Sequence, residues 1–198
     1  MEAAQERGFL GPAPVEEHWR HALGFAAAIA GSETKMPSTA LDLGAGGGVP
    51  GLALAEHWPS SRWTLLDAEL RRVRFLAEAV EDLGWGQRVT VVHARAEEAA
   101  RTDMRGSVEL VCARSFGSPA VTAECGAPFL RVGGVLVVSD PPSGGGDRWP
   151  AAGVAELGLD VSAHVAVDGG HFTVLRQAQP TPEKYPRRPS ARTRHPLF

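Results

Sequence analysis

The stretch Leu41-Asp42-Leu43-Gly44-Ala45-Gly46-Gly47-Gly48-Val49-Pro50-Gly51 decides the fold of this chain. A short apolar run carries one carboxylate, Asp42, and leads into a glycine-rich turn. Glycine tolerates positive φ and has no Cβ that would block a ligand lying against the backbone. Pro50 has the φ angle that the first turn of a helix needs. We therefore expect a strand, a ligand-binding turn and a helix, in the arrangement that holds a nucleoside-like cofactor.

Strands and helices alternate from this stretch onward. The hydrophobic pattern predicts strands over 40–43, 63–67, 89–92, 108–112 and 135–138, and helices over 50–57, 70–83, 96–100 and 120–130. Repeated β/α units predict an α/β fold with a parallel, doubly wound sheet. The runs 161–167 and 172–175 flank Asp168-Gly169-Gly170, which is a typical hairpin turn. The expected sheet is Rossmann-like, seven-stranded and mainly parallel, with an antiparallel C-terminal hairpin.

The composition is that of one soluble domain with appended ends. The chain has 198 residues, 43% of them hydrophobic, and a net charge of −3. No apolar run approaches the ~18 residues of a membrane span, and the acidic N-terminus is unlike a signal peptide, so we expect a cytoplasmic protein. The two cysteines lack metal-binding spacing, and we expect no metal. We divide the chain into a helical extension (1–38, with a helix over 15–29 and a loop over 31–38), a cofactor domain (39–178) and a basic tail (179–198).

Charge is distributed unevenly along the chain. The tail carries five cations and no acid between residues 184 and 195, whereas the rest has 15 basic and 23 acidic residues, a net charge of −8. An acidic body with a basic, proline-rich end favours nucleic-acid binding by the end, although a solvated, disordered tail has the same composition. The cations are Lys184, Arg187, Arg188, Arg192 and Arg194.

Candidate binding residues follow several of the predicted strands. Open α/β sheets bind ligands at the carboxyl ends of their strands, where the strand order reverses. The loops after the first four strands should therefore surround one crevice. The residues that they bring there are Asp42, Gly44, Ala45, Gly46, Gly48, Asp67, Ala96, Glu97 and Arg114.

Two classes of cofactor compete for the glycine-rich turn. Gly46-x-Gly48-x-x-Gly51 fits the dinucleotide fingerprint of NAD enzymes, with Asp67 as the ribose-binding acid. However, the strand already breaks at Gly44, Asp42 suits a cationic ligand, and the chain has no second domain for a hydride-transfer substrate. The frame Asp42-x-Gly44-x-Gly46-x-Gly48 is instead similar to the loop that class I methyltransferases wrap around S-adenosylmethionine. In that frame Asp42 lies near the methionine moiety, Asp67 takes the ribose hydroxyls, and Ala96-Glu97 borders the adenine.

Five separated blocks of the chain resemble one family. The turn with its Pro-Gly pair is similar to the first motif of the bacterial small-subunit (16S) ribosomal RNA guanine-N7 methyltransferases, also called glucose-inhibited division protein B. The remaining blocks follow in register, from the second strand to the C-terminus. They are Leu65-Leu66-Asp67 with Arg71-Arg72-x-x-Phe75-Leu76, Ala94-Arg95-Ala96-Glu97-Glu98, Ala113-Arg114-Ser115-Phe116, and Lys184-Tyr185-Pro186-Arg187-Arg188 with Arg194-His195-Pro196-Leu197.

The resemblance implies methyl transfer from S-adenosylmethionine to N7 of a guanine. N7 carries a lone pair and no proton, so the reaction needs no general base, and positioning and electrostatics carry it. Arg114 is expected to contact the substrate or the reacting end of the cofactor; the alternative is a structural ion pair with Asp67, Asp140 or a helix end. The tail cations would bind phosphates of ribosomal RNA or of the assembled small subunit.

The chain departs from the family on the substrate side. A lysine usually closes the fifth strand in the family, whereas this chain has Ser139-Asp140-Pro141-Pro142. Asp140-Pro141-Pro142-Ser143 is similar to the Asp/Asn-Pro-Pro-aromatic motif of amino-group methyltransferases, but it follows the fifth strand and lacks the aromatic residue, so we interpret it as a loop-forming turn. The N-terminal His-x-x-Asp-Ser motif has only its histidine, His21, which is followed by Gly24-Phe25. Two further hypotheses therefore stay open: a small-molecule or peptide methyltransferase, and a non-catalytic relative that binds cofactor or RNA.

Two weaker signals remain in the sequence. His18 and His21 are three residues apart and could suggest a metal, but the sequence offers no third ligand, and we interpret the pair as part of a helix surface. Trp149 either packs at a sheet edge or lines a substrate cleft.

Overall fold

A seven-stranded mixed sheet organises the molecule. The structure, a computed structural model, describes residues 1–30 and 36–198, so the loop predicted over 31–38 lies partly outside the described residues. The strands lie in the order β3-β2-β1-β4-β5-β7-β6. Their bounds are β1 Thr39–Leu43, β2 Arg62–Asp67, β3 Val89–His93, β4 Val108–Ala113, β5 Leu130–Asp140, β6 Leu159–Val167 and β7 Gly170–Gln177.

The strand order reverses between β1 and β4. The first five strands are parallel, with Leu43 opposite Leu66 on one side of β1 and Asp42 opposite Cys112 on the other. β7 runs antiparallel to both β5 and β6, and the hairpin turns at Asp168 and Gly169, which both have positive φ. The predicted doubly wound sheet with an antiparallel edge is confirmed. A ligand site is expected at the β1/β4 switch point.

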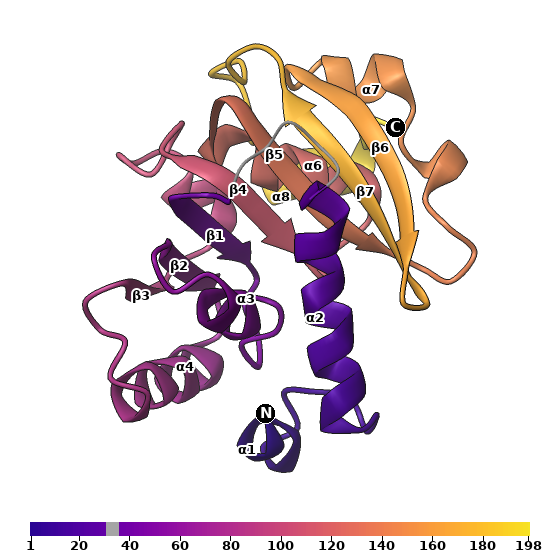
Figure 1. Cartoon of the computed structure of the whole chain (residues 1–198). Coiled ribbons are helices and arrows are strands. Elements are labelled where there is room, and N and C mark those ends of the chain that lie inside the picture. The colour runs from indigo at the N-terminus through magenta and orange to yellow at the C-terminus, as the bar shows by residue number, and fades with distance from the viewer. Residues whose placement is uncertain (31–35) are drawn as a thin grey trace.

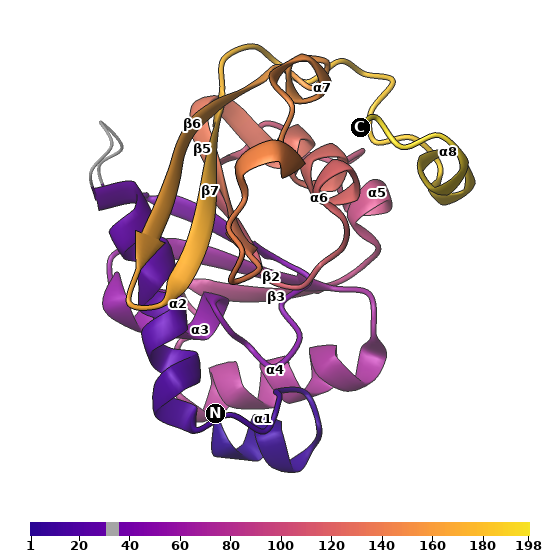
Figure 2. The same cartoon turned by 90° about the vertical axis from the view of Figure 1, so that its right-hand side faces the viewer.

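Helices cover both faces of the sheet (Figures 1 and 2). The residues of β1 alternate: Ala40 packs against the helices of one face, and Leu41 and Leu43 pack against those of the other. α2, α3 and α4 lie on the first face, and α5, α6 and α7 on the second. The helices are α1 Glu2–Glu6, α2 Val15–Ala30, α3 Gly51–His57, α4 Leu70–Asp82, α5 Ala96–Ala99, α6 Pro119–Gly126, α7 Ala151–Ala155 and α8 Pro189–Arg194, with 3-10 turns η1 Ala127–Phe129 and η2 Gly146–Arg148.

The helix expected over 120–130 is shorter than predicted. α6 ends at Gly126, η1 follows, and Leu130 already begins β5. Pro128 explains the difference, because proline has no N–H to donate and it restricts the residue before it. The sequence pattern counted the apolar residues of η1 as a continuation of the helix.

The basic tail is folded onto the body of the protein. Tyr185 is 2% exposed and belongs to the core cluster beneath α5 and α6, and its hydroxyl donates to Glu156. Leu197 and Phe198 pack against the same cluster. Figure 2 shows α8 beside α5 and α6. The interpretation of the tail as a solvated, disordered segment is therefore wrong.

Within the described residues, no helix is long and apolar enough to cross a membrane. The same residues contain no group of three or more His, Cys, Asp and Glu side chains that could hold a metal ion.

Candidate functional site

The glycine-rich turn lies at the carboxyl ends of β1 and β2. The backbone N–H groups of Gly44 and Ala45 donate to the carbonyl of Leu66 at 2.9 and 3.0 Å. Gly44, Gly46 and Gly48 all have positive φ, which an L-residue with a Cβ adopts only at a cost. The motif thus forms a tight turn whose backbone is fixed to the neighbouring strand.

Asp42 is fully buried beneath this turn. Its Oδ2 accepts a hydrogen bond from the Gly51 N–H at 2.7 Å, whereas its Oδ1 is buried and has no partner. Burial raises the pKa of Asp42 to about 7. A buried acceptor without a donor is costly, and a cationic ligand in the turn would both satisfy Oδ1 and favour the ionised carboxylate.

Asp67 closes β2 and joins the loops after β1 and β2. Its Oδ2 accepts from the Gly46 N–H at 2.9 Å, and its Oδ1 accepts from the Glu69 N–H at 2.8 Å. Arg72 lies 3.8 Å from Oδ2. A carboxylate has about four acceptor positions, so Asp67 can hold the turn and still accept hydrogen bonds from a ligand.

Ala96 and Glu97 begin α5, after β3. Glu97 Oε2 pairs with Arg192 of α8 at 3.3 Å, and its Oε1 is buried without a partner. Arg192 is 7% exposed and also donates to the thiol of Cys125 at 2.7 Å. The adenine-side loop predicted from the sequence is therefore fastened to the tail.

Arg114 directly follows β4 and is half-buried. Its Nη2 lies 3.1 Å from Nδ1 of His18, and its Nη1 is buried without a partner. Burial lowers the pKa of the guanidinium, and the carboxylate of Asp42 opposes this effect. The ion pairs with Asp67 or Asp140 that the sequence left open do not form.

Asp42 and Arg114 together flank the switch point between β1 and β4. One presents an unpaired acceptor and the other an unpaired donor, and both atoms are buried. A ligand with an ammonium and a carboxylate group would satisfy both, and the amino-acid end of S-adenosylmethionine carries these two groups. We call the loops after β1, β2 and β3 the cofactor side. We call the loops after β4 and β5 the acceptor side, where acceptor means the methyl acceptor and not a hydrogen-bond acceptor.

Two histidines that the sequence suggested only as part of a helix surface belong to this site. α2 places His18 against Arg114, and it places His21 Nε2 at 2.9 Å from the Ser139 hydroxyl at the end of β5. His18 is 4% exposed, so the interpretation of the pair as a helix surface is wrong. Burial, with Arg114 and His18 nearby, lowers the pKa of His21 to about 4. The sequence feature that could have identified these histidines is their i, i+3 spacing, which puts both rings on one face of the helix.

Asp140, the acid at the end of β5, accepts hydrogen bonds from three side chains. Its Oδ1 accepts from Arg148 Nη1 at 3.0 Å and from the Trp149 indole N–H at 3.1 Å. Its Oδ2 accepts from the Thr173 hydroxyl at 2.5 Å. Trp149 is 3% exposed, so it packs in the core and also lines a cavity next to Asp140.

The tail cations fall into two groups. The Arg187 side chain donates through Nε and Nη2 to the two oxygens of Glu124, at 3.0 and 2.7 Å, and its backbone N–H donates to Oε1. Arg187 and Arg192 are thus occupied by internal partners, Glu124 and Glu97. The other three cations, Lys184, Arg188 and Arg194, are exposed.

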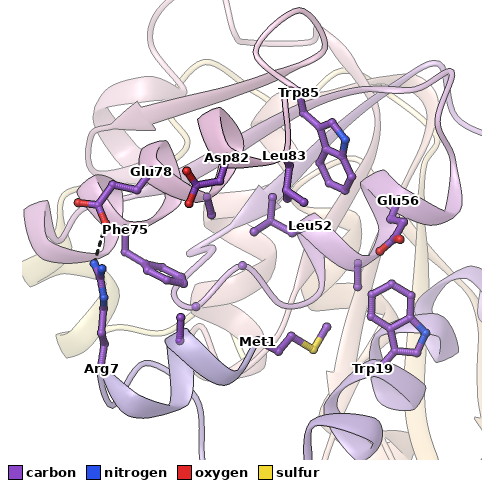
Figure 3. Close-up of a pocket in the computed structure, with 15 residues that line it drawn as sticks. Met1, Arg7, Trp19, Leu52, Glu56, Phe75, Glu78, Asp82, Leu83 and Trp85 are labelled. Atoms are coloured by element: carbon purple, nitrogen blue, oxygen red, sulfur yellow. Dashed lines mark hydrogen bonds and ion pairs between the residues drawn. The ribbon is translucent and has the colours of Figure 1, made fainter.

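A second cavity lies behind the glycine-rich turn (Figure 3). It has a volume of about 350 Å³ and is lined by residues of α1 to α4, such as Trp19, and by Trp85, which follows α4. Arg7 pairs with Glu78 at 2.8 Å beside it. The cavity reaches Gly47 and Gly48 but none of the charged residues Asp42, Asp67 and Arg114. We therefore assign the candidate site to the carboxyl edge of the sheet.

Comparison with known proteins identifies the family. The family described as rRNA small subunit methyltransferase G (GidB) matches residues 1–139. Ribosomal RNA small subunit methyltransferase G of Moorella thermoacetica is 32% identical over 191 residues, which is 92% of this chain and 79% of the relative. Its counterpart in Deinococcus radiodurans is 37% identical over 166 residues, which is 80% of this chain and 65% of the relative.

A solved structure supports the fold. A T. thermophilus 16S rRNA methyltransferase, in complex with AdoMet and guanosine, superimposes with a TM-score of 0.55 at 21% identity, over 82% of this chain and 40% of that one. The predicted α/β methyltransferase fold and the predicted family, with its methyltransferase class and S-adenosylmethionine cofactor, are confirmed. The chain therefore belongs to the rRNA small subunit methyltransferase G family.

Proposed function

We propose that this chain methylates N7 of a guanine in small-subunit ribosomal RNA, with S-adenosylmethionine as the methyl donor. The observation that carries the proposal is the pair of unsatisfied buried atoms, Asp42 Oδ1 and Arg114 Nη1, at the switch point between β1 and β4. They match the two charged groups at one end of this cofactor. The match to the methyltransferase G family over residues 1–139 supports the reaction.

The remaining residues of the cofactor side complete the proposed binding site. Asp67 would bind the ribose hydroxyls with the acceptor positions that Gly46 and Glu69 leave free. Gly44, Ala45, Gly46 and Gly48 would form the wall of backbone along the cofactor, and Ala96 and Glu97 would border the adenine. Bound S-adenosylmethionine supplies a methyl group on a positively charged sulfur, which is an electrophile.

The protein's own part in the reaction is positioning. Guanine N7 has a lone pair and no proton, so no side chain has to remove one. Arg114 would orient the reacting end of the cofactor site, and His18 holds the Arg114 guanidinium in place through the 3.1 Å contact. The lowered pKa of His21 keeps this ring neutral at physiological pH, so it adds no positive charge beside Arg114.

The proposed partner is ribosomal RNA or the small ribosomal subunit. Lys184, Arg188 and Arg194 are exposed and would bind phosphates, which gives salt-dependent affinity with little sequence information. Arg187 and Arg192, which the sequence placed in the same group, would contribute by holding the tail in place. A ribosomal substrate would place the protein in the cytoplasm.

The proposal is tested by transfer of a labelled methyl group from S-adenosylmethionine to ribosomal RNA. The RNA comes from a strain that lacks this gene and is offered both naked and as small subunits. We expect the RNA to become labelled, and we expect nuclease treatment to release this label. Cofactor binding without label in either RNA substrate would contradict the proposal. It would favour a small molecule or peptide as the methyl acceptor, or a non-catalytic protein that binds cofactor or RNA.

A further inference from the structure

A cavity of about 280 Å³ opens between the loops after β4 and β5. This volume is close to the ~300 Å³ lower end of the range for small-molecule sites. Phe116 and Gly117 line it from the β4 side, and Ser139, Arg148 and Trp149 line it from the β5 side. It combines an aromatic side chain, a cation and a polar strand end on the acceptor side of the crevice. The Asp140 carboxylate also lines it, with both oxygens already bonded to side chains of the protein.

Phe116 connects this cavity with the cofactor side. Its ring lies directly over Gly44, where an added Cβ would be 2.7 Å from Phe116 Cδ2. The ring therefore touches the glycine-rich turn and also lines the cavity. A flat group that stacks on Phe116 from the cavity would lie next to the turn that holds the proposed cofactor.

Arg148 supplies the cation at the cavity, and Asp140 determines its position. The buried Asp140 carboxylate accepts from Arg148 Nη1, while Trp149 and Thr173 occupy its other positions. The Arg148 side chain is 40% exposed. A guanidinium has five N–H donors, so the one bond to Asp140 leaves others for a ligand. The arrangement suits an anionic oxygen at the mouth of the cavity, because arginine binds phosphate through paired N–H groups.

We infer that the cavity binds the target nucleotide, with its base stacked on Phe116 and its phosphate bound by Arg148. Because the base is the methyl acceptor, this inference rests on the proposed function. An unpaired base that is turned out of its stack is the form in which enzymes modify nucleobases, and aromatic side chains bind such bases by stacking. Asp140 is a positioning residue, since it acts through Arg148.

The test compares Arg148→Ala with Arg131→Ala in the methyl-transfer assay. Arg131 is the matched control, because it also pairs with one carboxylate, that of Glu109 at 2.8 Å, but lies at the opposite end of β5. Arg148→Ala should raise the KM for RNA roughly tenfold, the effect of one lost charge-assisted hydrogen bond. It should also flatten the dependence of log KM on log salt by about 0.7 to 0.9, the slope of one phosphate contact. Cofactor affinity should not change, and Arg131→Ala should behave as wild type.

Further variants separate loss of the contact from damage to the loop. Arg148→Lys should keep the salt slope of the wild type. The double variant Asp140→Asn with Arg148→Gln leaves no buried carboxylate unpaired, and it should show the same flatter slope as Arg148→Ala. Phe116→Leu should lower methyl transfer without a change in the salt slope. If the wild-type enzyme labels RNA but Arg148→Ala keeps the KM and salt slope of the wild type, the inference about the cavity is wrong and the proposed function stands. A higher KM with an unchanged slope would also overturn the inference about the cavity, because the contact would not be to phosphate. If the wild-type enzyme labels no RNA, the proposed function itself fails.

Discussion

The cofactor side and the acceptor side of the crevice differ in how far apart their contacting residues lie in the sequence. On the cofactor side, Asp42 binds Gly51 nine positions away, and Asp67 binds Gly46 over 21 positions. On the acceptor side, Arg114 contacts His18 over 96 positions, and Ser139 contacts His21 over 118. The glycine-rich turn and Asp67 are thus built from one or two continuous motifs, although Glu97 of the same side reaches the distant tail. Arg114 and Ser139 of the acceptor side depend instead on how α2 packs on the sheet.

The largest effect should come from the tail, which is paired with Glu97 of α5 and Glu124 of α6. Arg187→Ala leaves the Glu124 carboxylate, whose side chain is 1% exposed, without its cation. Breaking a buried pair in this way costs about 3 to 5 kcal/mol, which denaturant unfolding measures. Arg194→Ala changes an exposed cation of the same tail and should stay within about 0.5 kcal/mol of wild type. Equal stability of the two variants would mean that the tail does not belong to the scaffold.

The next effect should be confined to the cofactor side. Asp67→Ala removes the acceptor for both Gly46 and Glu69 and should weaken S-adenosylmethionine binding roughly 100-fold, since each charge-assisted bond contributes about 1.5 to 3 kcal/mol. Calorimetric titration with the cofactor gives the value. Glu69→Ala is the control, because it removes an exposed acid but keeps the backbone N–H that Asp67 binds. A wild-type dissociation constant for Asp67→Ala would remove Asp67 from the site.

The pH dependence of cofactor binding tests the role of Asp42. Its pKa in the folded protein is about 7, and a cationic ligand would favour the ionised form, so affinity should fall as the pH drops below 7, by up to about tenfold per unit. For the free protein the sign is reversed: this group's contribution to stability falls as the pH rises from about 4, its unfolded pKa, to 7. The Asp42→Asn variant should bind the cofactor weakly, and its cofactor affinity should not show this pH dependence. Equal wild-type affinity at pH 8 and pH 5.5 would show that Asp42 does not respond to the ligand's charge.

The smallest effect concerns the point where the two sides touch. Gly44→Ala and Gly84→Ala both place a Cβ at positive φ, +74° and +68°, at a cost of about 1 to 2 kcal/mol in stability. At Gly44 the added Cβ would also collide with the Phe116 ring, whereas at Gly84 nothing lies within 4 Å of it. Gly44→Ala should therefore lose more stability than Gly84→Ala and should also impair cofactor binding and methyl transfer. Identical thermal midpoints and activities for the two would mean that Phe116 does not rest on the turn.

The same difference explains what the sequence could predict. The alternation of apolar runs, the glycine-rich turn and the acid that closes β2 are local signals, and they predicted the sheet and the residues of the cofactor side. The partners of Arg114 and Ser139 follow from tertiary packing of α2, which no local pattern encodes. The interpretation of Asp140-Pro141-Pro142-Ser143 as a turn missed that Asp140 accepts hydrogen bonds from three side chains.

One buried charge did leave a usable signal. Glu124 stands in the mostly apolar helix α6, between Ala123 and Cys125, where an ionised side chain needs a partner. That position could have predicted that one tail cation is structural. The choice of Arg187, 63 residues away, required the structure.

Mapping the methyl group in labelled ribosomal RNA tests the proposed transfer to guanine N7. Methylation at N7 places a positive charge on the guanine ring, so reduction followed by aniline cleaves the chain at that nucleotide. We expect cleavage at a labelled guanine in RNA treated with wild-type enzyme, and none with Asp67→Ala at a cofactor concentration that saturates only the wild type. Labelled RNA that resists this cleavage would contradict transfer to N7.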